Sequence, residues 1–180
     1  YPFTVIAIVG IINAFNMLDG MDGVVGSLVI TTLIMFHLFT GTVPGFVSLA
    51  IGASLIAFLV SNLNLSPIIP KTFLGDAGSK LLGFIVVCLL LAAASSQVVR
   101  TKLIQPVTAL FIVSLPLYDM VFTTLRRIAR KGSPFAADRS HIHHLMQDLG
   151  FSDRRCLVLI LGIHMSFAFI GLMLHRAGAP

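Results

Sequence analysis

Amides and carboxylates gather where the first apolar stretch of the sequence ends. Residues 13–23 are Asn-Ala-Phe-Asn-Met-Leu-Asp-Gly-Met-Asp-Gly, so that Asn13 and Asn16 are three residues apart, as are Asp19 and Asp22. On a helix this spacing brings two side chains close together. Such groups are costly at bilayer depth unless they pair or face a polar cavity. The segment predicts a polar binding site at a helix mouth or, in the simpler alternative, a polar helix end that glycines terminate.

A second group of small and charged residues surrounds one carboxylate directly before another apolar stretch. Residues 71–80 are Lys-Thr-Phe-Leu-Gly-Asp-Ala-Gly-Ser-Lys, with Asp76 at the centre. The start of a helix offers free N–H groups and a positive dipole end, so this pattern suits a divalent cation or a phosphate group. A plain N-cap role for Asp76 fits equally well, because aspartate is favoured there. The spacing of a nucleotide-binding P-loop is absent.

Three histidines within four residues form the third group, in the segment Asp-Arg-Ser-His-Ile-His-His-Leu-Met-Gln-Asp-Leu-Gly over residues 138–150. The apolar residues at 142, 145, 146 and 149 follow helical spacing, which places His141, His144 and Asp148 on the opposite, polar face. The segment therefore predicts a short amphipathic helix at the membrane interface, ended by Gly150. Histidines there suit phosphate binding, acid–base catalysis or metal ligation, but no zinc-type spacing accompanies them. A surface helix that is merely rich in histidine is the simpler alternative.

The composition shows what kind of fold must position these groups. The chain has 180 residues, 57% apolar and 11% charged, with a mean hydropathy of +0.99, whereas a soluble domain carries about 25% charged residues. Its apolar runs are long and continuous, which favours helices over the alternating strands of a barrel. We therefore predict an all-α, polytopic transmembrane helical bundle. The net charge of +5 is typical of cytoplasmic loops and anionic headgroups, so we expect no nucleic acid partner.

Six apolar stretches approach the length of about 20 residues that a membrane span needs. They cover residues 1–18, 24–42, 44–62, 80–96, 104–124 and 155–174, in a single membrane domain over 1–180 whose segment 125–154 is a basic loop. Alternating spans would place nine of the 12 Lys and Arg residues on one side, which the positive-inside rule makes cytoplasmic. All three groups described above lie on that side. Asp119 lies within the fifth span, toward the same side, where a pairing or supporting role is expected.

Together, the three groups resemble motifs of the polyprenyl-phosphate N-acetylhexosamine-1-phosphate transferases, which are of the glycosyltransferase 4 type and include the phospho-MurNAc-pentapeptide translocase. The segment 13–23 is similar to the family's N-A-x-N-x-x-D-G-x-D-G, and residues 73–79 are similar to F-M-G-D-x-G-S. The His-Ile-His-His of residues 141–144 resembles the GlcNAc-type branch of the family rather than its H-H-H branch. The motifs occur in the family's order and extend over essentially the whole chain.

The resemblance implies transfer of GlcNAc-1-phosphate, or a related N-acetylhexosamine-1-phosphate, from a UDP-sugar to undecaprenyl phosphate with release of UMP. It implies Mg²⁺ or Mn²⁺ as cofactor, a site on the cytoplasmic face of the bacterial inner membrane, and leaves a homodimer open. The implied catalytic residues are Asp19, Asp22, Asp76, His141, His143 and His144, with Asp76 as metal ligand. The implied substrate-binding residues are Asn13, Asn16, Gly20, Met21, Asn62, Lys71, Phe73 and Arg139.

One departure from the family concerns an adjacent Asp-Asp pair that the resemblance leads us to expect in an earlier cytoplasmic loop. This sequence contains no Asp-Asp. The family also has about ten spans, so we expect the chain to be the C-terminal part of such an enzyme, with further spans and the Asp-Asp pair encoded upstream of Tyr1.

Other membrane proteins share parts of this pattern. Tyr118-Asp119 and Gly75-Asp76 echo the motifs of intramembrane aspartyl proteases, but in reversed order and with Phe73 in place of the first glycine. CDP-alcohol phosphotransferases also use Asp-Gly motifs, but their alanine-arginine step after Asp-Gly is absent. A transporter or channel would be expected to carry its ionisable groups near mid-membrane rather than at one face.

Overall fold

The computed structural model describes residues 2–42, 45–95, 104–131, 133 and 140–177. The expected Arg139 and Asp138 lie outside these residues, as do Arg100 and Lys102. Eight helices and no strands are present in the described part of the chain, which confirms the all-α prediction. The helices are α1 (Pro2–Leu18), α2 (Val24–Thr40), α3 (Phe46–Asn62), α4 (Gly75–Ala94), α5 (Pro106–Ile112), α6 (Ser114–Ala129), α7 (Ile142–Asp148) and α8 (Asp153–Arg176).

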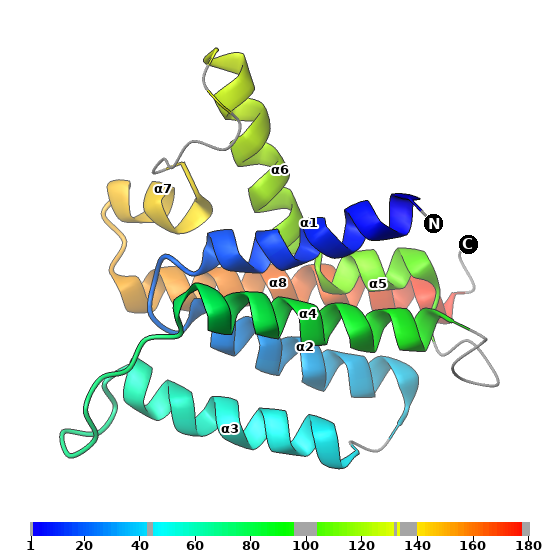
Figure 1. Ribbon diagram of the computed structural model, residues 1–180, viewed down its shortest axis with the longest axis horizontal. Coiled ribbons are helices and arrows are strands. Elements are labelled where there is room, and N and C mark those ends of the chain that lie inside the picture. The colour runs from blue at the N-terminus through cyan, green and yellow to red at the C-terminus, as the bar shows by residue number, and fades with distance from the viewer. Residues whose placement is uncertain (1, 43–44, 96–103, 132, 134–139, 178–180) are drawn as a thin grey trace.

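Most of the helices run roughly parallel and form one apolar bundle (Figure 1). α1 packs against α4 and α6, while α2 packs against α8, α3 and α4. α5 packs against α8, and α3 lies at the edge of the bundle (Figure 1). The buried side chains that join these layers include Phe15, Leu28, Val86 and Ile160. Gly83 lets α4 approach α1 closely, because a Cβ there would lie 3.1 Å from the Cα of Ile12.

The lengths and composition of the helices suit a membrane. Among the described residues, α4 and α8 are each long and apolar enough to cross one. α1, α2 and α3 are apolar helices of 17 residues. At a rise of about 1.5 Å per residue they extend about 25 Å, close to the thickness of a hydrocarbon core of about 30 Å. These helices match the first four expected spans and the last one, and the fold class is that of a helical membrane protein.

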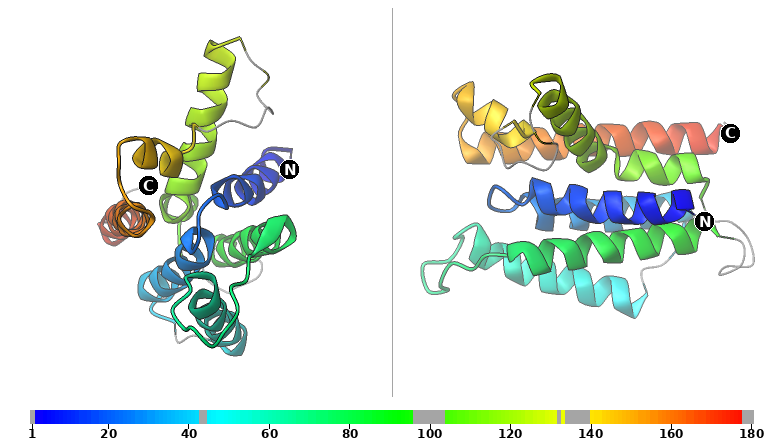
Figure 2. Two further views of the ribbon diagram at one scale, coloured as in Figure 1. Left: turned by 90° about the vertical axis from the view of Figure 1, so that its left-hand side faces the viewer. Right: turned by 45° about the horizontal axis from the view of Figure 1, so that its top comes forward.

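The fifth expected span differs from the prediction of one helix over 104–124. It consists of α5 and α6, which are bent by 75° at Val113. Pro116 explains the break, because a proline has no N–H to donate to the carbonyl four residues earlier and its ring clashes with that carbonyl. Pro116 instead occupies the first turn of α6, where no such bond is needed. α6 consequently leaves the bundle at a steep angle (Figures 1 and 2).

The three groups predicted from the sequence meet at one end of the bundle. The loop after α1, the loop between α3 and α4, and the short helix α7 all lie there, while α2 ends and α3 begins at the opposite end (Figure 1). This arrangement follows from antiparallel helices of similar length, because every second connection returns to the same end. The expected amphipathic helix at residues 142–149 is present as α7.

Candidate active site

The tight turn of residues 19–23 joins α1 to α2 and carries the first motif. The backbone N–H of Asp19 donates to the carbonyl of Asn16 at 3.2 Å, and Gly23 has a φ of 79° at the N-cap of α2. A residue with a side chain is strained in that left-handed conformation, so glycine is required. Asp19 and Asp22 are partly exposed on this turn, whereas Met21 is buried.

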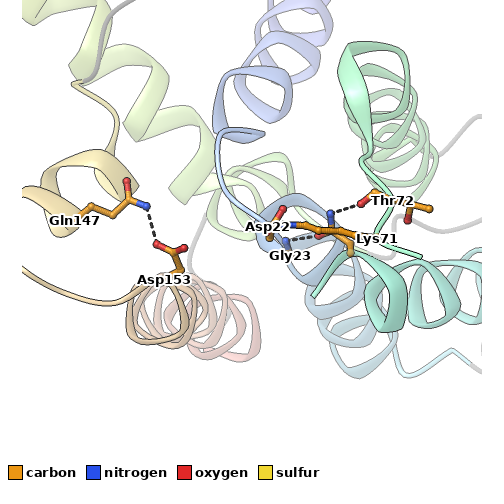
Figure 3. A network of polar contacts seen from close by, with 7 residues as sticks. Asp22, Gly23, Lys71, Thr72, Gln147 and Asp153 are labelled. Carbon is orange, nitrogen blue, oxygen red and sulfur yellow. Dashed lines mark hydrogen bonds and ion pairs between the residues drawn. The ribbon is translucent and has the colours of Figure 1, made fainter. Parts of the chain in front are cut away.

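Asn62 connects this turn to the second motif. It is 4% exposed at the end of α3, and its Oδ1 accepts from the backbone N–H of Gly23 at 2.6 Å. Its Nδ2 donates to the carbonyl of Thr72 at 2.8 Å (Figure 3). One amide therefore satisfies a donor of the first motif and an acceptor of the second, which fixes the two motifs relative to each other.

Lys71 forms the second connection between these motifs. Its Nζ is paired with Oδ2 of Asp22 (Figure 3). The same Nζ lies 5.1 Å from the centre of the Phe73 ring. The Phe73 side chain itself is 74% exposed. An exposed aromatic ring with a cation on one side suits stacking against a planar base.

Asp76 lies in the first turn of α4, and the residue that caps this helix is Leu74. The alternative of a plain N-cap is therefore wrong. The Asp76 side chain is 83% exposed, with Nζ of Lys80 3.5 Å from Oδ2. Its neighbour Ser79 is buried and donates to Oδ1 of Asn16 at 2.9 Å, which holds the start of α4 against the end of α1.

The carboxyl group of Asp19 has a raised pKa. Partial burial, with the nearby carboxylates of Asp76 and Asp22, raises the pKa of Asp19 from 3.8 to about 6. Each neighbour disfavours ionisation because like charges repel. A cation placed among these carboxylates would offset the repulsion that Asp19 experiences.

The first histidine of the cluster is buried rather than on an exposed polar face, so that part of the prediction is wrong. His141 is 7% exposed, and its Nδ1 lies 2.7 Å from Oδ2 of Asp119 on α6. Its Nε2 lies 3.4 Å from Nη2 of Arg127 on the same helix. The helical pattern of the sequence did not reveal this partner because α6 covers the face that the pattern assigned to water.

His143 is fully buried behind the first motif. A Cβ built on Gly20 would lie 2.4 Å from Nε2 of His143, so the ring rests against the glycine backbone. Burial, together with His144 and His141, lowers the pKa of His143 from 6.5 to about 4. The ring is therefore neutral near pH 7. His144 is partly buried, and its Nδ1 lies 3.2 Å from Oε1 of Gln147.

A polar pocket of about 390 Å³ lies between these elements. Seven of the expected site residues line it: Asp19, Gly20, Met21, Asp22, Asn62, Phe73 and Asp76. Asn16 and Lys71 support it through Ser79 and Asp22, whereas Asn13 is exposed on α1 and bonds to the carbonyl of Val9. The three histidines stand behind this pocket rather than in its lining.

Two polar side chains of the pocket were missed from the sequence, namely Gln147 and Asp153. Nε2 of Gln147 donates to Oδ1 of Asp153 at 2.8 Å, and together they line the side formed by α7 and α8 (Figure 3). Asp153 is the first residue of α8. Its position at the start of α8, beside the third motif, is the one sequence signal that pointed to the site.

The carboxylates of the pocket suit a hard cation that takes most of its other oxygen ligands from the substrate and from water. In the described part of the chain, no group of three or more His, Cys, Asp or Glu side chains converges as a metal cage. Mg²⁺ commonly uses one or two carboxylates and completes its shell with water and phosphate oxygens. Asp19 and Asp76 are near enough to interact electrostatically and both line the pocket, so they fit this requirement.

Comparison with known proteins supports the resemblance drawn from the motifs. The family model of glycosyl transferase family 4 matches residues 1–94. An Escherichia coli K12 protein named undecaprenyl-phosphate alpha-N-acetylglucosaminyl 1-phosphate transferase is 39% identical over 96% of this chain and 47% of its own length. Its Salmonella typhi namesake is 42% identical over 89% of this chain and 44% of its own length.

A more distant relative comes from Bacillus subtilis and is named probable undecaprenyl-phosphate N-acetylglucosaminyl 1-phosphate transferase. It is 34% identical over 98% of this chain and 49% of its own length. The chain thus spans about half the length of these relatives. Because the family model covers more than half of the chain, including two of the three motifs, the chain belongs to glycosyl transferase family 4.

Proposed function

We propose that the protein containing this chain transfers N-acetylglucosamine 1-phosphate from UDP-N-acetylglucosamine to undecaprenyl phosphate and releases UMP. The observation that carries the proposal is the polar, carboxylate-lined pocket at one end of an apolar bundle. A water-soluble nucleotide and a lipid phosphate can meet only at a membrane interface, and a polar pocket at the end of an apolar bundle suits that position. The names of the relatives described above refer to this activity.

In the proposed reaction, an oxygen of the acceptor phosphate attacks the sugar-linked phosphorus of the donor. The bond from that phosphorus to the bridging oxygen breaks, and UMP leaves with that oxygen. The lipid product carries a new pyrophosphate linkage to the sugar. Because both reactants are anions, the site must offset their repulsion and hold the in-line geometry.

The residues of the pocket divide these tasks. Phe73 offers a face for the uracil ring, and Lys71 holds both that ring and the Asp22 carboxylate in place. Asp19 and Asp76 would hold Mg²⁺, which supplies the positive charge that two anionic phosphates require. The raised pKa of Asp19 supports this assignment, because a cation relieves the repulsion among the three carboxylates.

We also propose that the pocket faces the cytoplasm of a bacterial inner membrane. Lys71, Lys80, Arg154 and Arg155 lie in the elements that meet at this end. An excess of cations marks the cytoplasmic side of a membrane protein. This orientation gives the pocket access to the nucleotide pool of the cell.

The full-length protein in detergent or nanodiscs tests the proposal. UMP release is measured with UDP-N-acetylglucosamine, undecaprenyl phosphate and Mg²⁺, and a parallel reaction with UDP-N-acetylgalactosamine identifies the sugar. We expect Asp76→Asn to lower the rate at least about 100-fold, and Asp148→Asn, an exposed acid outside the pocket, to leave it unchanged. Full-length protein that releases no UMP from either donor would show the proposal to be wrong.

A further inference from the structure

The carboxylate of Asp119 is buried and both of its oxygens are bound to the start of α7. Oδ1 accepts from the backbone N–H of Ile142 at 2.7 Å, and Oδ2 lies 2.7 Å from Nδ1 of His141. Asp119 is 9% exposed and His141 is 7% exposed. A buried carboxylate with two short contacts is held in one orientation.

The contact with Asp119 supplies a hydrogen-bond acceptor for the first turn of α7. α7 has seven residues, its N-cap is His141, and no side chain of its own caps its first turn. Isolated helices of this length are unstable, and their first N–H groups need acceptors. Asp119 provides an acceptor and a negative charge from α6, next to the positive end of the α7 dipole.

The two neighbours of His141 also select its tautomer. A carboxylate accepts hydrogen bonds, so the proton of the neutral ring must be on Nδ1. Nη2 of Arg127 is 3.4 Å from Nε2, and a guanidinium only donates, so Nε2 must present its lone pair. Arg127 is 7% exposed, which places this cation and the carboxylate on either side of the ring within the protein.

The residues of α7 connect the Asp119–His141 contact to the pocket. The His143 ring stacks at 6.0 Å on His141 and rests against Gly20, while Gln147 bonds to Asp153 in the pocket lining. Asp119 itself does not line that pocket; it lies at an apolar groove between α6 and α8. It therefore acts on the site through other residues.

We infer that Asp119 is a positioning residue that docks α7 on α6 and holds His141 as its Nδ1–H tautomer, so that α7 keeps its side of the pocket in place. The consequence for catalysis rests on the function proposed above. The docking and the tautomer rest only on the contacts of Asp119, His141 and Arg127.

The tautomer is tested directly by NMR of the full-length protein labelled with ¹⁵N-histidine, with His141→Asn used to assign the signals. Near pH 7 the wild-type ring should be protonated at Nδ1 and unprotonated at Nε2. In Asp119→Asn, Oδ1 still accepts from Ile142, so the amide NH₂ faces Nδ1 while Arg127 still faces Nε2. Neither tautomer then suits both neighbours, and the share of the Nδ1–H form should fall. Asp148 is an exposed acid on α7, and Asp148→Asn should leave the signals unchanged.

This readout does not depend on transferase activity. A wild-type ring protonated at Nε2 would overturn the inference even if no variant folds, and so would an unchanged tautomer in Asp119→Asn. If the wild-type protein releases no UMP but shows the expected tautomer, the proposed function fails while the docking role stands.

Kinetics test the consequence for the site. We expect Asp119→Asn to lower kcat/KM for the UDP-sugar about 10-fold or more. Combined with His141→Asn it should add little, because residues that act as one unit are not additive. Wild-type kcat/KM in Asp119→Asn, or losses that add fully in the double variant, would contradict the positioning role.

Discussion

Gly20 and His143 lie in different motifs, yet the backbone of one supports the ring of the other. A Cβ on Gly20 would lie 2.4 Å from Nε2 of the buried His143. The turn that carries Asp19 and Asp22 can therefore take this position only if residue 20 has no side chain. The contact joins α7 to the turn of the first motif, which lines the pocket.

We predict that Gly20→Ala destabilises the protein by about 1–3 kcal/mol, because the methyl group overpacks a buried ring. Thermal unfolding of the purified full-length protein measures the change. Gly52→Ala is the matched control, since a Cβ there meets nothing within 4 Å and should not destabilise. Adding His143→Ala should recover part of the stability that Gly20→Ala loses. If Gly20→Ala lowers the stability equally with His or Ala at position 143, the contact is disproved.

The raised pKa of Asp19 predicts a pH-dependent change in stability. In the folded protein the pKa of Asp19 is about 6, against 3.8 for an aspartate in water. The folded state therefore holds the proton more tightly, so ionisation destabilises the fold progressively between about pH 4 and pH 6 and fully above that range. Without Mg²⁺, Asp19→Asn should raise the free energy of unfolding near pH 7.5 by about 1 kcal/mol after allowance for solvent screening.

Near pH 4 the same substitution should have a much smaller effect, because Asp19 is then almost fully protonated in the folded state and partly protonated in the unfolded state. Thermal unfolding at the two pH values gives the comparison, and Asp148→Asn serves as the exposed control. A gain for Asp19→Asn that is as large near pH 4 as near pH 7.5 would show that relief of charge is not its cause.

Binding of Mg²⁺ should weaken as the pH falls through about 6, because protonation of Asp19 removes one of the proposed oxygen ligands. The increase in melting temperature on adding Mg²⁺ measures this at each pH. The increase should be large near pH 7.5, small near pH 5, and absent at both in Asp76→Asn. An equal increase in the wild-type protein and Asp76→Asn would exclude Asp76 as a ligand.

Asn62→Ala should lower the free energy of unfolding by about 2 kcal/mol, because it removes two hydrogen bonds, at 2.6 and 2.8 Å, from a buried side chain. Nucleotide binding should weaken as well, since the two motifs are no longer held together. Asn13→Ala, on the exposed face of α1, should change the stability by less than about 0.5 kcal/mol. Isothermal titration with UDP and thermal unfolding provide the two measurements; equal stability losses in the two variants would argue against the bridge.

Gln147→Ala should raise KM for the UDP-sugar up to about 10-fold with a smaller change in kcat, because it loses one polar contact of the pocket lining and releases Asp153. Steady-state kinetics with two UDP-N-acetylhexosamines would show whether this side of the pocket distinguishes sugars. Asp148→Asn, one residue further along but outside the pocket, is the control. An unchanged KM for both donors would remove Gln147 from the binding site.

Much of the site was predictable from the sequence by itself. Apolar runs that are continuous and nearly as long as a membrane is thick must be helices, because lipid offers no partners for unpaired backbone groups. Antiparallel helices of similar length return every second connection to the same end. These two facts place Asp19, Asn62, Phe73 and Asp76 together before any contact is known, and the structure puts all four in one pocket.

The tertiary structure decided what the buried polar groups bind. Pro116 was visible in the sequence, but whether it kinks a span or turns it out of the bundle depends on the packing around it. In the structure α6 is bent by 75° relative to α5 and leaves the bundle. That departure brings Asp119 to His141 and covers a face that helical periodicity assigns to water. Gln147 and Asp153 reach the pocket through the same docking. Local pattern specifies which residues share a helix face, whereas the partner of a buried charge is set by contacts between distant segments, which periodicity does not encode.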